Sequence, residues 1–240
     1  MNVKREKSLD FIAQGLYEAF LLLLKLDPET ISAIIVTVKS STLSIIFSLL
    51  IGFPLGFMLG FFEFPFRRPL KLLSDTLLAI PTVVVGLILY AFISHRGPFG
   101  EYELLYTMEG IVIGQTLLAL PIIISLTATT IEGMEKKLSL TLSSFGLTMR
   151  QMIQSVVWEL RHALLAVVVT AYGRIVAEVG IAMMIGGNIK WFTRTITTAI
   201  SLETSKGEFS MGIALGIVLI SIAFLANLSL YNLKKRSRER

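Results

Sequence analysis

Long apolar runs separated by short polar segments dominate the chain. Most of these runs approach or exceed the roughly 20 apolar residues that a helix needs to cross a bilayer. They predict spans at residues 11–26, 33–62, 72–94, 109–131, 162–186 and 210–233. The first run is the shortest and contains Glu18, so it could be a span or an interfacial helix. The pattern predicts an all-α, polytopic membrane bundle of six helices that forms a single domain over 1–240.

Composition agrees with a membrane protein. Of the 240 residues, 54% are hydrophobic and 16% are charged, whereas a soluble domain carries about 25% charged residues. The chain has no cysteine and only two histidines, which excludes a disulfide framework, a thiolate metal site and a His-rich metal site. We therefore predict no bound metal. The net charge of +5 could suggest nucleic acid, but the basic residues lie beside apolar runs, which favours a role in membrane orientation.

Lysine and arginine are concentrated in alternate connections. Basic clusters precede the first run, separate the second from the third, separate the fourth from the fifth and form the tail from Lys234 to Arg240. By the positive-inside rule, both termini and the segment 132–161 face the cytoplasm, which requires an even number of spans. The mixed segment 187–209 then lies outside. It could be a solvated loop with an interfacial Trp191 and Phe192, or a docking surface or pathway mouth.

Small residues recur every fourth position in the second run: Ser40, Ser44, Ser48, Gly52, Gly56 and Gly60. Positions four apart share a helix face. Small residues on one face allow another helix to approach closely, which is how membrane helices associate. The stripe predicts tight helix packing in a multi-helix bundle or dimer.

Prolines and glycines predict irregular helices. Pro54, Pro81 and Pro121 fall inside three of the predicted spans, where each removes a helical hydrogen bond. Gly180 and the pair Gly186–Gly187 would loosen the outer end of the fifth span.

Two opposite charges lie deep in the fifth predicted span. Arg174 and Glu178 are four residues apart, so on one helix they would share a face and could pair. A charge inside the bilayer normally faces protein or water and has a partner. The pair could be an internal or inter-subunit salt bridge, which we favour, or an anion contact in a transport path.

Residues 139–160, SLTLSSFGLTMRQMIQSVVWEL, interrupt the apolar pattern with an amphipathic stripe. Leu142, Phe145, Met149, Met152 and Val156 recur every three or four residues, which predicts helix. Gly146 suits a turn between two short helices. From pattern alone the segment is a surface helix on the cytoplasmic leaflet. The chain lacks a phosphate-binding P-loop motif, so active transport would need energy from another chain or an ion gradient.

The position of this segment resembles the coupling region of the permease subunits of ATP-binding-cassette (ABC) importers. That region carries an acidic-Ala-Ala, three residues, Gly motif and contacts the ATPase subunit. Gly146 matches the motif glycine, whereas Leu140, Thr141 and Leu142 replace the acidic-Ala-Ala residues and Glu159 replaces the closing proline. The resemblance implies that the following residues contact the ATPase: Leu142, Ser143, Ser144, Phe145, Gly146, Leu147, Thr148, Met149, Gln151 and Met152.

Two further blocks are similar to molybdate, tungstate and sulfate permeases. The first is IPTVVVGL at 80–87, which includes Pro81, Thr82 and Gly86. The second is RIVAEVG at 174–180, continuing to Gly186, Gly187, Asn188 and the Thr193–Arg194–Thr195 triplet. The run from Gly186 to Phe209 is most similar to the tungstate branch.

The resemblance covers roughly residues 30–230. It implies the type I importer fold, a homodimer of permease subunits, two cytoplasmic ABC ATPases that bind ATP, and an extracytoplasmic oxyanion-binding protein. This chain would then be no enzyme and would bind no cofactor and no nucleic acid. It would be a multi-pass protein of the cell membrane, and its remaining contacts would be with membrane lipid. Two rival interpretations are a secondary transporter or channel without an ATPase and a membrane enzyme, for which no catalytic constellation is found.

Overall fold

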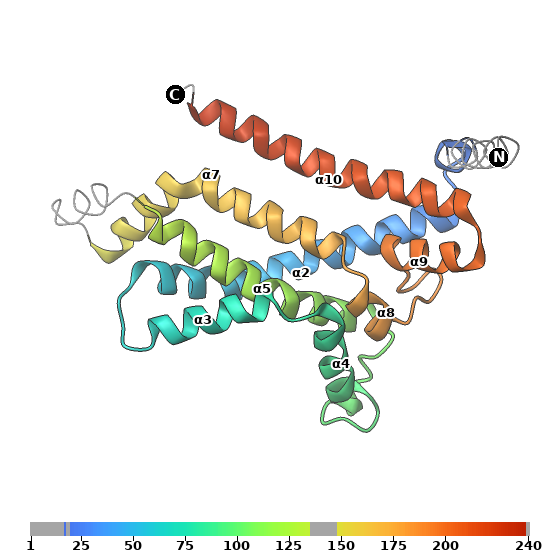
Figure 1. The fold of residues 1–240 in the computed structure, drawn as a ribbon, viewed down its shortest axis with the longest axis horizontal. Helices are drawn as coiled ribbons and strands as arrows, with labels where there is room; N and C mark the ends of the chain where they lie inside the picture. The colour runs from blue at the N-terminus through green and yellow to red at the C-terminus, as the bar shows by residue number, and fades with distance from the viewer. Residues whose placement is uncertain (1–16, 18–19, 135–147, 239–240) are drawn as a thin grey trace, which may run out of the picture. The chain divides into compact units, whose positions relative to one another are not determined.

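The computed structural model describes residue 17 and residues 20–134 and 148–238. Over these residues the chain is helical and contains no strand, which confirms the all-α prediction. The helices are α2 (Pro28–Phe61), α3 (Arg67–Leu78), α4 (Thr82–Ile93), the 3₁₀ helix η1 (Gly100–Tyr102), α5 (Met108–Glu132), α7 (Met149–Val176), α8 (Gly180–Gly186), α9 (Ile196–Lys206) and α10 (Phe209–Arg238) (Figure 1).

Three of the described helices, α2, α5 and α7, are long and apolar enough to cross a membrane. The bent pair of α3 and α4 would count as a fourth crossing, and Phe209–Leu225 in α10 is a shorter apolar stretch. α2 and α5 match the predicted spans 33–62 and 109–131 closely. The predicted first span, 11–26, falls mostly outside the described residues.

The third predicted span, 72–94, is not one straight helix. α3 and α4 meet at an angle of 100°. Pro81 is the residue before α4, and a proline disfavours helical geometry in the residue that precedes it, here Ile80. The break at 79–81 therefore follows from Pro81, for which the sequence predicted only an irregular helix.

Several polar residues of α3 lie on the side that faces α5. Ser74 is buried, and the Asp75 carboxylate accepts a hydrogen bond from Ser125. Glu132 at the end of α5 pairs with Arg67 at 2.7 Å and with Lys71. The leucines of α3 are exposed instead: Leu70, Leu72, Leu73, Leu77 and Leu78. Polar groups facing protein and apolar groups facing outward are the pattern expected of a helix in lipid.

The fifth predicted span, 162–186, has wrong boundaries. α7 begins at Met149, so the amphipathic residues 149–161 and the apolar residues after them form one continuous helix. That helix ends at Val176, and α8 begins at Gly180 after a three-residue connection. The segment 187–209 is also more ordered than a solvated loop, because it contains α9, in which Ile196, Thr198 and Ala199 are fully buried.

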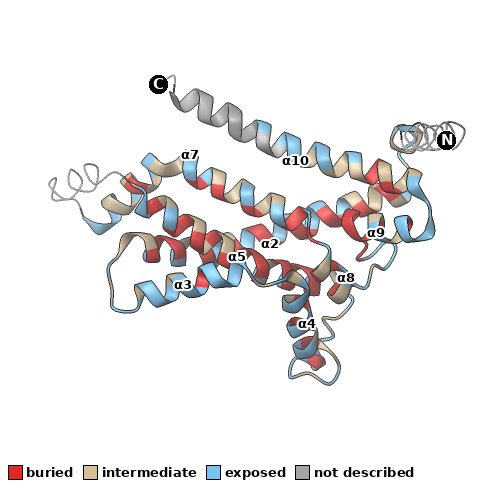
Figure 2. Cartoon of the chain, in the orientation of Figure 1, coloured by how far each residue is buried: buried red, intermediate tan, exposed pale blue. Residues whose placement is uncertain are grey.

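The described residues divide into two compact units, and the same helices contribute to both. The first takes Met1–Leu43, Pro81–Gln115 and Ile175–Phe224; the second takes Ser44–Ile80, Thr116–Arg174 and Leu225–Arg240. In the first, Ala33, Ile196, Ala199 and Leu215 form a buried cluster. In the second, the cluster is formed by Phe57, Ile131 and Val156. Figure 2 shows buried residues along α2 and α5. The single domain over 1–240 stays a prediction.

The glycines of the predicted small-residue stripe lie against α5 in the second unit. A Cβ atom on Gly56 would be 2.7 Å from the carbonyl oxygen of Ile124, and one on Gly60 would be 2.8 Å from that of Ala128. Gly52 has more room, since its nearest neighbour is a side-chain carbon of Ile123 at 3.2 Å. One turn before Gly52, the Ser48 hydroxyl donates a hydrogen bond to the carbonyl oxygen of Thr116 at 3.2 Å. The stripe thus brings two helices of the same chain to backbone contact.

Candidate functional site

The two sequence blocks singled out at 80–87 and 174–188 pack against each other in the first unit. α4, which contains Thr82 and Gly86, lies beside α8, which begins at Gly180 (Figure 1). A Cβ atom on Gly86 would be 3.1 Å from the sulfur of Met184, and one on Gly180 would be 3.3 Å from the hydroxyl of Thr82. Both glycines therefore stand where two short helices approach closely.

Glu178 lies in the connection between α7 and α8, not on a helix. It is 2% exposed, and one carboxylate oxygen accepts hydrogen bonds from the backbone N–H groups of Gly180 at 2.8 Å and Ile181 at 3.3 Å. A carboxylate at a helix N-terminus satisfies unpaired N–H groups and favours the helix dipole. The expectation that Arg174 and Glu178 share one helix face is wrong, because α7 ends at Val176. Their ion pair stays a prediction.

Buried threonines join α2, α8 and α9, and the sequence analysis did not single out most of them. Thr195 forms a capping box with Thr198 at the start of α9. Thr37 of α2 accepts a hydrogen bond from the N–H of Ile196 at 2.7 Å, and Thr197 donates one to the carbonyl oxygen of Glu178 at 2.7 Å. The threonine-rich run 193–198 was the only sign of this network in the sequence. It does not by itself predict buried hydroxyl groups, because their hydrogen-bond partners lie in other segments.

The residues predicted in the outer loop end α8 and fix the chain after it. Gly187 adopts a φ of 67°, in the left-handed region, and its N–H donates to the carbonyl of Met183 at 3.1 Å, which is a common helix C-terminus. Thr193 donates to the carbonyl of Gly186 and accepts from the N–H of Ile189 at 3.0 Å. Asn188 has a φ of 53° and a buried side-chain oxygen.

An acidic residue at the start of α2 contacts the connection between α8 and α9. The Glu29 carboxylate pairs with both Lys190 and Arg194. Two of the three residues between these cations are exposed aromatics, Trp191 at 52% and Phe192 at 72%. Trp191 has a φ of 71°, and a bulky residue in that region costs about 1–3 kcal/mol and persists only where its surroundings impose it. The ion pairs and the Thr193 hydrogen bonds supply that restraint.

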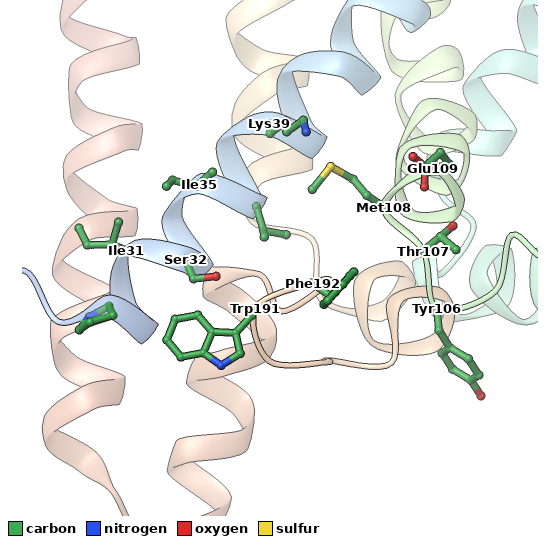
Figure 3. A pocket seen from close by; sticks show the side chains of 12 residues that line it. Ile31, Ser32, Ile35, Lys39, Tyr106, Thr107, Met108, Glu109, Trp191 and Phe192 are labelled. Carbon is green, nitrogen blue, oxygen red and sulfur yellow. The ribbon is translucent and has the colours of Figure 1, made fainter.

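A cavity of about 750 Å³ opens beside these aromatics. Its wall is formed by the N-terminal third of α2, the start of α5 and the Trp191–Phe192 pair (Figure 3). Lys39 of α2 and Glu109 of α5 are its charged residues. The sequence analysis missed Lys39, although a lysine inside an apolar run is a recognisable signal.

The predicted ATPase-coupling residues Leu142 to Leu147 lie outside the described residues. Of the remaining four, Thr148 directly precedes α7, and Met149, Gln151 and Met152 lie in its first turn. The Gln151 side-chain oxygen accepts hydrogen bonds from the N–H and the hydroxyl of Thr148, both at 2.9 Å. This reciprocal arrangement fixes where the helix begins. Met149 beside it is 53% exposed.

Among the residues that the structure describes, no cluster of three or more His, Cys, Asp or Glu side chains could hold a metal ion.

Comparison with known proteins places this arrangement in a family. Residues 52–239 match the family described as "Binding-protein-dependent transport system inner membrane component". The chain is 57% identical to the tungstate uptake system permease protein TupB of Campylobacter jejuni, covering 95% of both chains. It is 34% identical to the protein of the same name from Peptoclostridium acidaminophilum, covering 95% of this chain and 100% of the relative.

A solved structure has the same fold. It is that of a bacterial alginate ABC transporter in complex with an alginate pentasaccharide-bound periplasmic protein. The similarity has a TM-score of 0.71 at 19% identity and covers 95% of this chain and 88% of that one. The family match over residues 52–239 and the identities to curated relatives lead to one conclusion: the chain belongs to the family of binding-protein-dependent transport system inner membrane components.

Proposed function

We propose that this chain is the membrane-spanning permease subunit of an ABC importer that moves tungstate across the cytoplasmic membrane. One observation carries the proposal, namely the 57% identity with a tungstate uptake permease over 95% of both chains. The second relative, at 34% identity, has the same name. Molybdate and sulfate are the alternative cargoes, because their permeases share the blocks at 80–87 and 174–180.

The working importer would contain a second copy of this chain, two cytoplasmic ABC ATPases and an extracytoplasmic oxyanion-binding protein. ATP would bind to the ATPase subunits, since this chain has no P-loop. The family description itself specifies dependence on a binding protein. With basic clusters at both ends of the chain and at 132–161, both termini would face the cytoplasm.

The coupling segment about 132–161 would receive the motion of the ATPases. Its described end supports this role mechanically, because Thr148 and Gln151 fix the first turn of α7 and the helix continues unbroken to Val176. At 1.5 Å per residue the 28 residues of α7 extend about 42 Å. A displacement at the ATPase would therefore reach the connection that holds Glu178 along one continuous helix.

The mechanism would then be a change in which side of the membrane the pathway opens to. Closure of the ATPase dimer on ATP would move the two coupling segments together, and the pathway between the two permease subunits would switch from one side to the other. Selection of the anion would reside mainly in the binding protein. A near-neutral Arg174–Glu178 pair fits that division, since a path that bound a dianion tightly would not release it.

Reconstitution tests the cargo. The permease, its ATPase and its binding protein are placed in liposomes, and ATP-dependent uptake of tungstate is measured with molybdate or sulfate as competitor. We expect uptake that needs ATP and the binding protein and that a tenfold excess of sulfate does not suppress, with molybdate the closer competitor because of its similar size and charge. Uptake that sulfate suppresses as well as unlabelled tungstate does would contradict the tungstate assignment. Uptake driven by an ion gradient without the ATPase would favour a secondary transporter.

Substitution in the coupling segment tests the contact with the ATPase. Phe145→Asp or Gly146→Glu should abolish copurification of the ATPase and ATP-driven uptake, while the permease keeps its thermal stability. The first places a charge in the apolar stripe, and the second places one at the motif glycine. Arg68→Gln, at an exposed basic residue outside the segment, is the matched control and should copurify normally. Normal copurification and normal uptake by both coupling variants would exclude this segment as the ATPase contact.

A further inference from the structure

The cavity beside Trp191 contains a cation that the fold does not explain. Lys39 lines it, and among the described residues its ammonium group forms no hydrogen bond or ion pair. By contrast, two neighbouring cations, Lys190 and Arg194, are paired, since both contact Glu29. A cation within a membrane-spanning helix normally has a partner or a function.

The position of Glu109, the carboxylate in the same cavity, is explained by the fold. It lies in the first turn of α5, where a negative charge is favoured by the helix dipole. The helix dipole does not favour the charge of Lys39, because Lys39 lies about three turns inside α2 and far from the helix C-terminus at Phe61. The cavity therefore presents one unpaired cation, the Ser32 hydroxyl and an apolar aromatic wall (Figure 3).

The length of α2 places Lys39 near the outer boundary of the bilayer. Its 34 residues extend about 51 Å, whereas the hydrocarbon core takes about 20 residues, or 30 Å. Counted back from Phe61, beside the basic residues Arg67, Arg68 and Lys71, the core ends at about residue 42. Lys39 and the cavity then lie just outside the core, on the side where an imported anion arrives.

The wall of this cavity is held in a fixed shape. Tyr106 and Trp191 both line it, and both have left-handed backbone, with φ of 63° and 71°. The N–H of Tyr106 donates to the carbonyl of Ile185 at 2.7 Å, and its ring lies against Gly187. Two aromatic residues held in an unfavourable conformation around one cavity indicate a site whose geometry matters.

From the unpaired cation, the position and the fixed wall, we propose that this cavity binds a tetrahedral oxyanion group through the ammonium group of Lys39. The group could be the free dianionic cargo after it leaves the binding protein, or the phosphate of a phospholipid. The first source rests on the proposed function. Glu109 offsets the charge of Lys39 in the same cavity, so the contact with a cargo anion is weak and permits release.

The chain provides its own reporter for this site. It contains two tryptophans, Trp158 and Trp191, so Trp158→Phe leaves Trp191 as the sole tryptophan, in the cavity wall. The full chain with this substitution is placed in nanodiscs of phosphatidylethanolamine or, separately, of phosphate-free galactolipid, and sodium tungstate is added. We expect a saturable change in Trp191 fluorescence.

Substitutions at the two charged residues give effects of opposite sign. Lys39→Gln should raise the half-saturating tungstate concentration on the order of tenfold, the effect of losing one hydrogen bond to a charged group. Lys39→Arg should retain binding, and Glu109→Gln should tighten it. Lys25→Gln is the matched control, because Lys25 is an exposed lysine nearby in the chain that does not line the cavity. Circular dichroism verifies that each variant is folded.

The lipid matrix identifies the source of the anion. A response in both matrices supports the free cargo anion, and a response only in galactolipid, lost when phospholipid is present, supports a lipid phosphate. No saturable response in either matrix, or equal affinity in Lys39→Gln and wild type, overturns the site. Failure of the proposed function is separable, because it would appear as an absence of ATP-driven tungstate uptake by the wild-type complex, whatever the fluorescence shows.

Discussion

Substituting the glycines of α2 by alanine tests whether the contact with α5 holds the second unit together. A Cβ atom on Gly56 would lie 2.7 Å from the carbonyl oxygen of Ile124 and 2.8 Å from the Cβ of Thr127. Real Cβ atoms do not approach that closely, so the two helices must separate. Gly216 in α10 is the matched control, because a Cβ atom there has no neighbour within 4 Å.

The magnitude follows from two opposing terms. Alanine in place of a helical glycine gains about 1 kcal/mol in helix propensity. Overpacking costs about 1–3 kcal/mol, and the clash at Gly56 is with backbone, which cannot rotate away, so the upper end applies. Gly56→Ala should therefore lose about 1–2 kcal/mol net, which lowers the melting temperature of a chain this size by about 2–8 °C. Gly216→Ala should leave the melting temperature unchanged or raise it by a few degrees, since only the propensity term remains.

The measurement is thermal unfolding of the full chain in detergent, followed by circular dichroism. Gly60→Ala should behave like Gly56→Ala, because its Cβ atom would lie 2.8 Å from the carbonyl oxygen of Ala128. Gly52→Ala should lie between these variants and the control, since its nearest neighbour, at 3.2 Å, is a side-chain atom that can move. If Gly56→Ala is as stable as Gly216→Ala, close helix packing is not why glycine stands there.

Two further substitutions test single polar contacts, each measured as a change in melting temperature. Glu132→Gln weakens the attachment of Arg67 and Lys71 and should cost about 1 kcal/mol, or 2–4 °C, with a smaller effect at high salt; a salt-independent loss would point to packing instead. Thr197→Val removes the buried hydrogen bond to the carbonyl of Glu178 and should cost about 1–2 kcal/mol, whereas Thr76→Val, at an exposed hydroxyl bonded within α3, should be near neutral. Equal effects at both threonines would refute a special role for the bond to Glu178.

The apolar pattern was sufficient to locate the main helices. The predicted spans 33–62 and 109–131 differ from α2 and α5 by a few residues at most, because bilayer thickness sets the length of the run. The same pattern could not locate the breaks at 79–81 and 177–179. Pro81 was recognised, but whether a proline kinks a membrane helix or ends it depends on neighbours that can satisfy the freed backbone groups.

The site was harder to predict than the fold because its polar residues act on backbone atoms. Read along a continuous helix, Glu178 had Arg174 as its obvious partner. In the structure, Glu178 stands beyond the helix end and accepts hydrogen bonds from two N–H groups of α8. Residues 196–206 looked like a loop because their threonines are polar, yet Thr197 and Thr198 are buried with hydrogen-bond partners. Such partners come from segments distant in the sequence, so the hydrophobic periodicity of one segment cannot predict them.

Three carboxylates that the structure places at helix ends share a feature that bears on anion transport. Glu29 is matched by Lys190 and Arg194, Glu132 by Arg67 and Lys71, and Glu178 by the N-terminus of α8. A dianion approaching an uncompensated carboxylate in a low-dielectric region would be repelled by several kcal/mol. An oxyanion path thus requires that acidic residues be neutralised by their own structure. Lys39 forms no ion pair with a carboxylate, so its ammonium group is available to the anion, while Glu109 in the same cavity limits how tightly the anion is held.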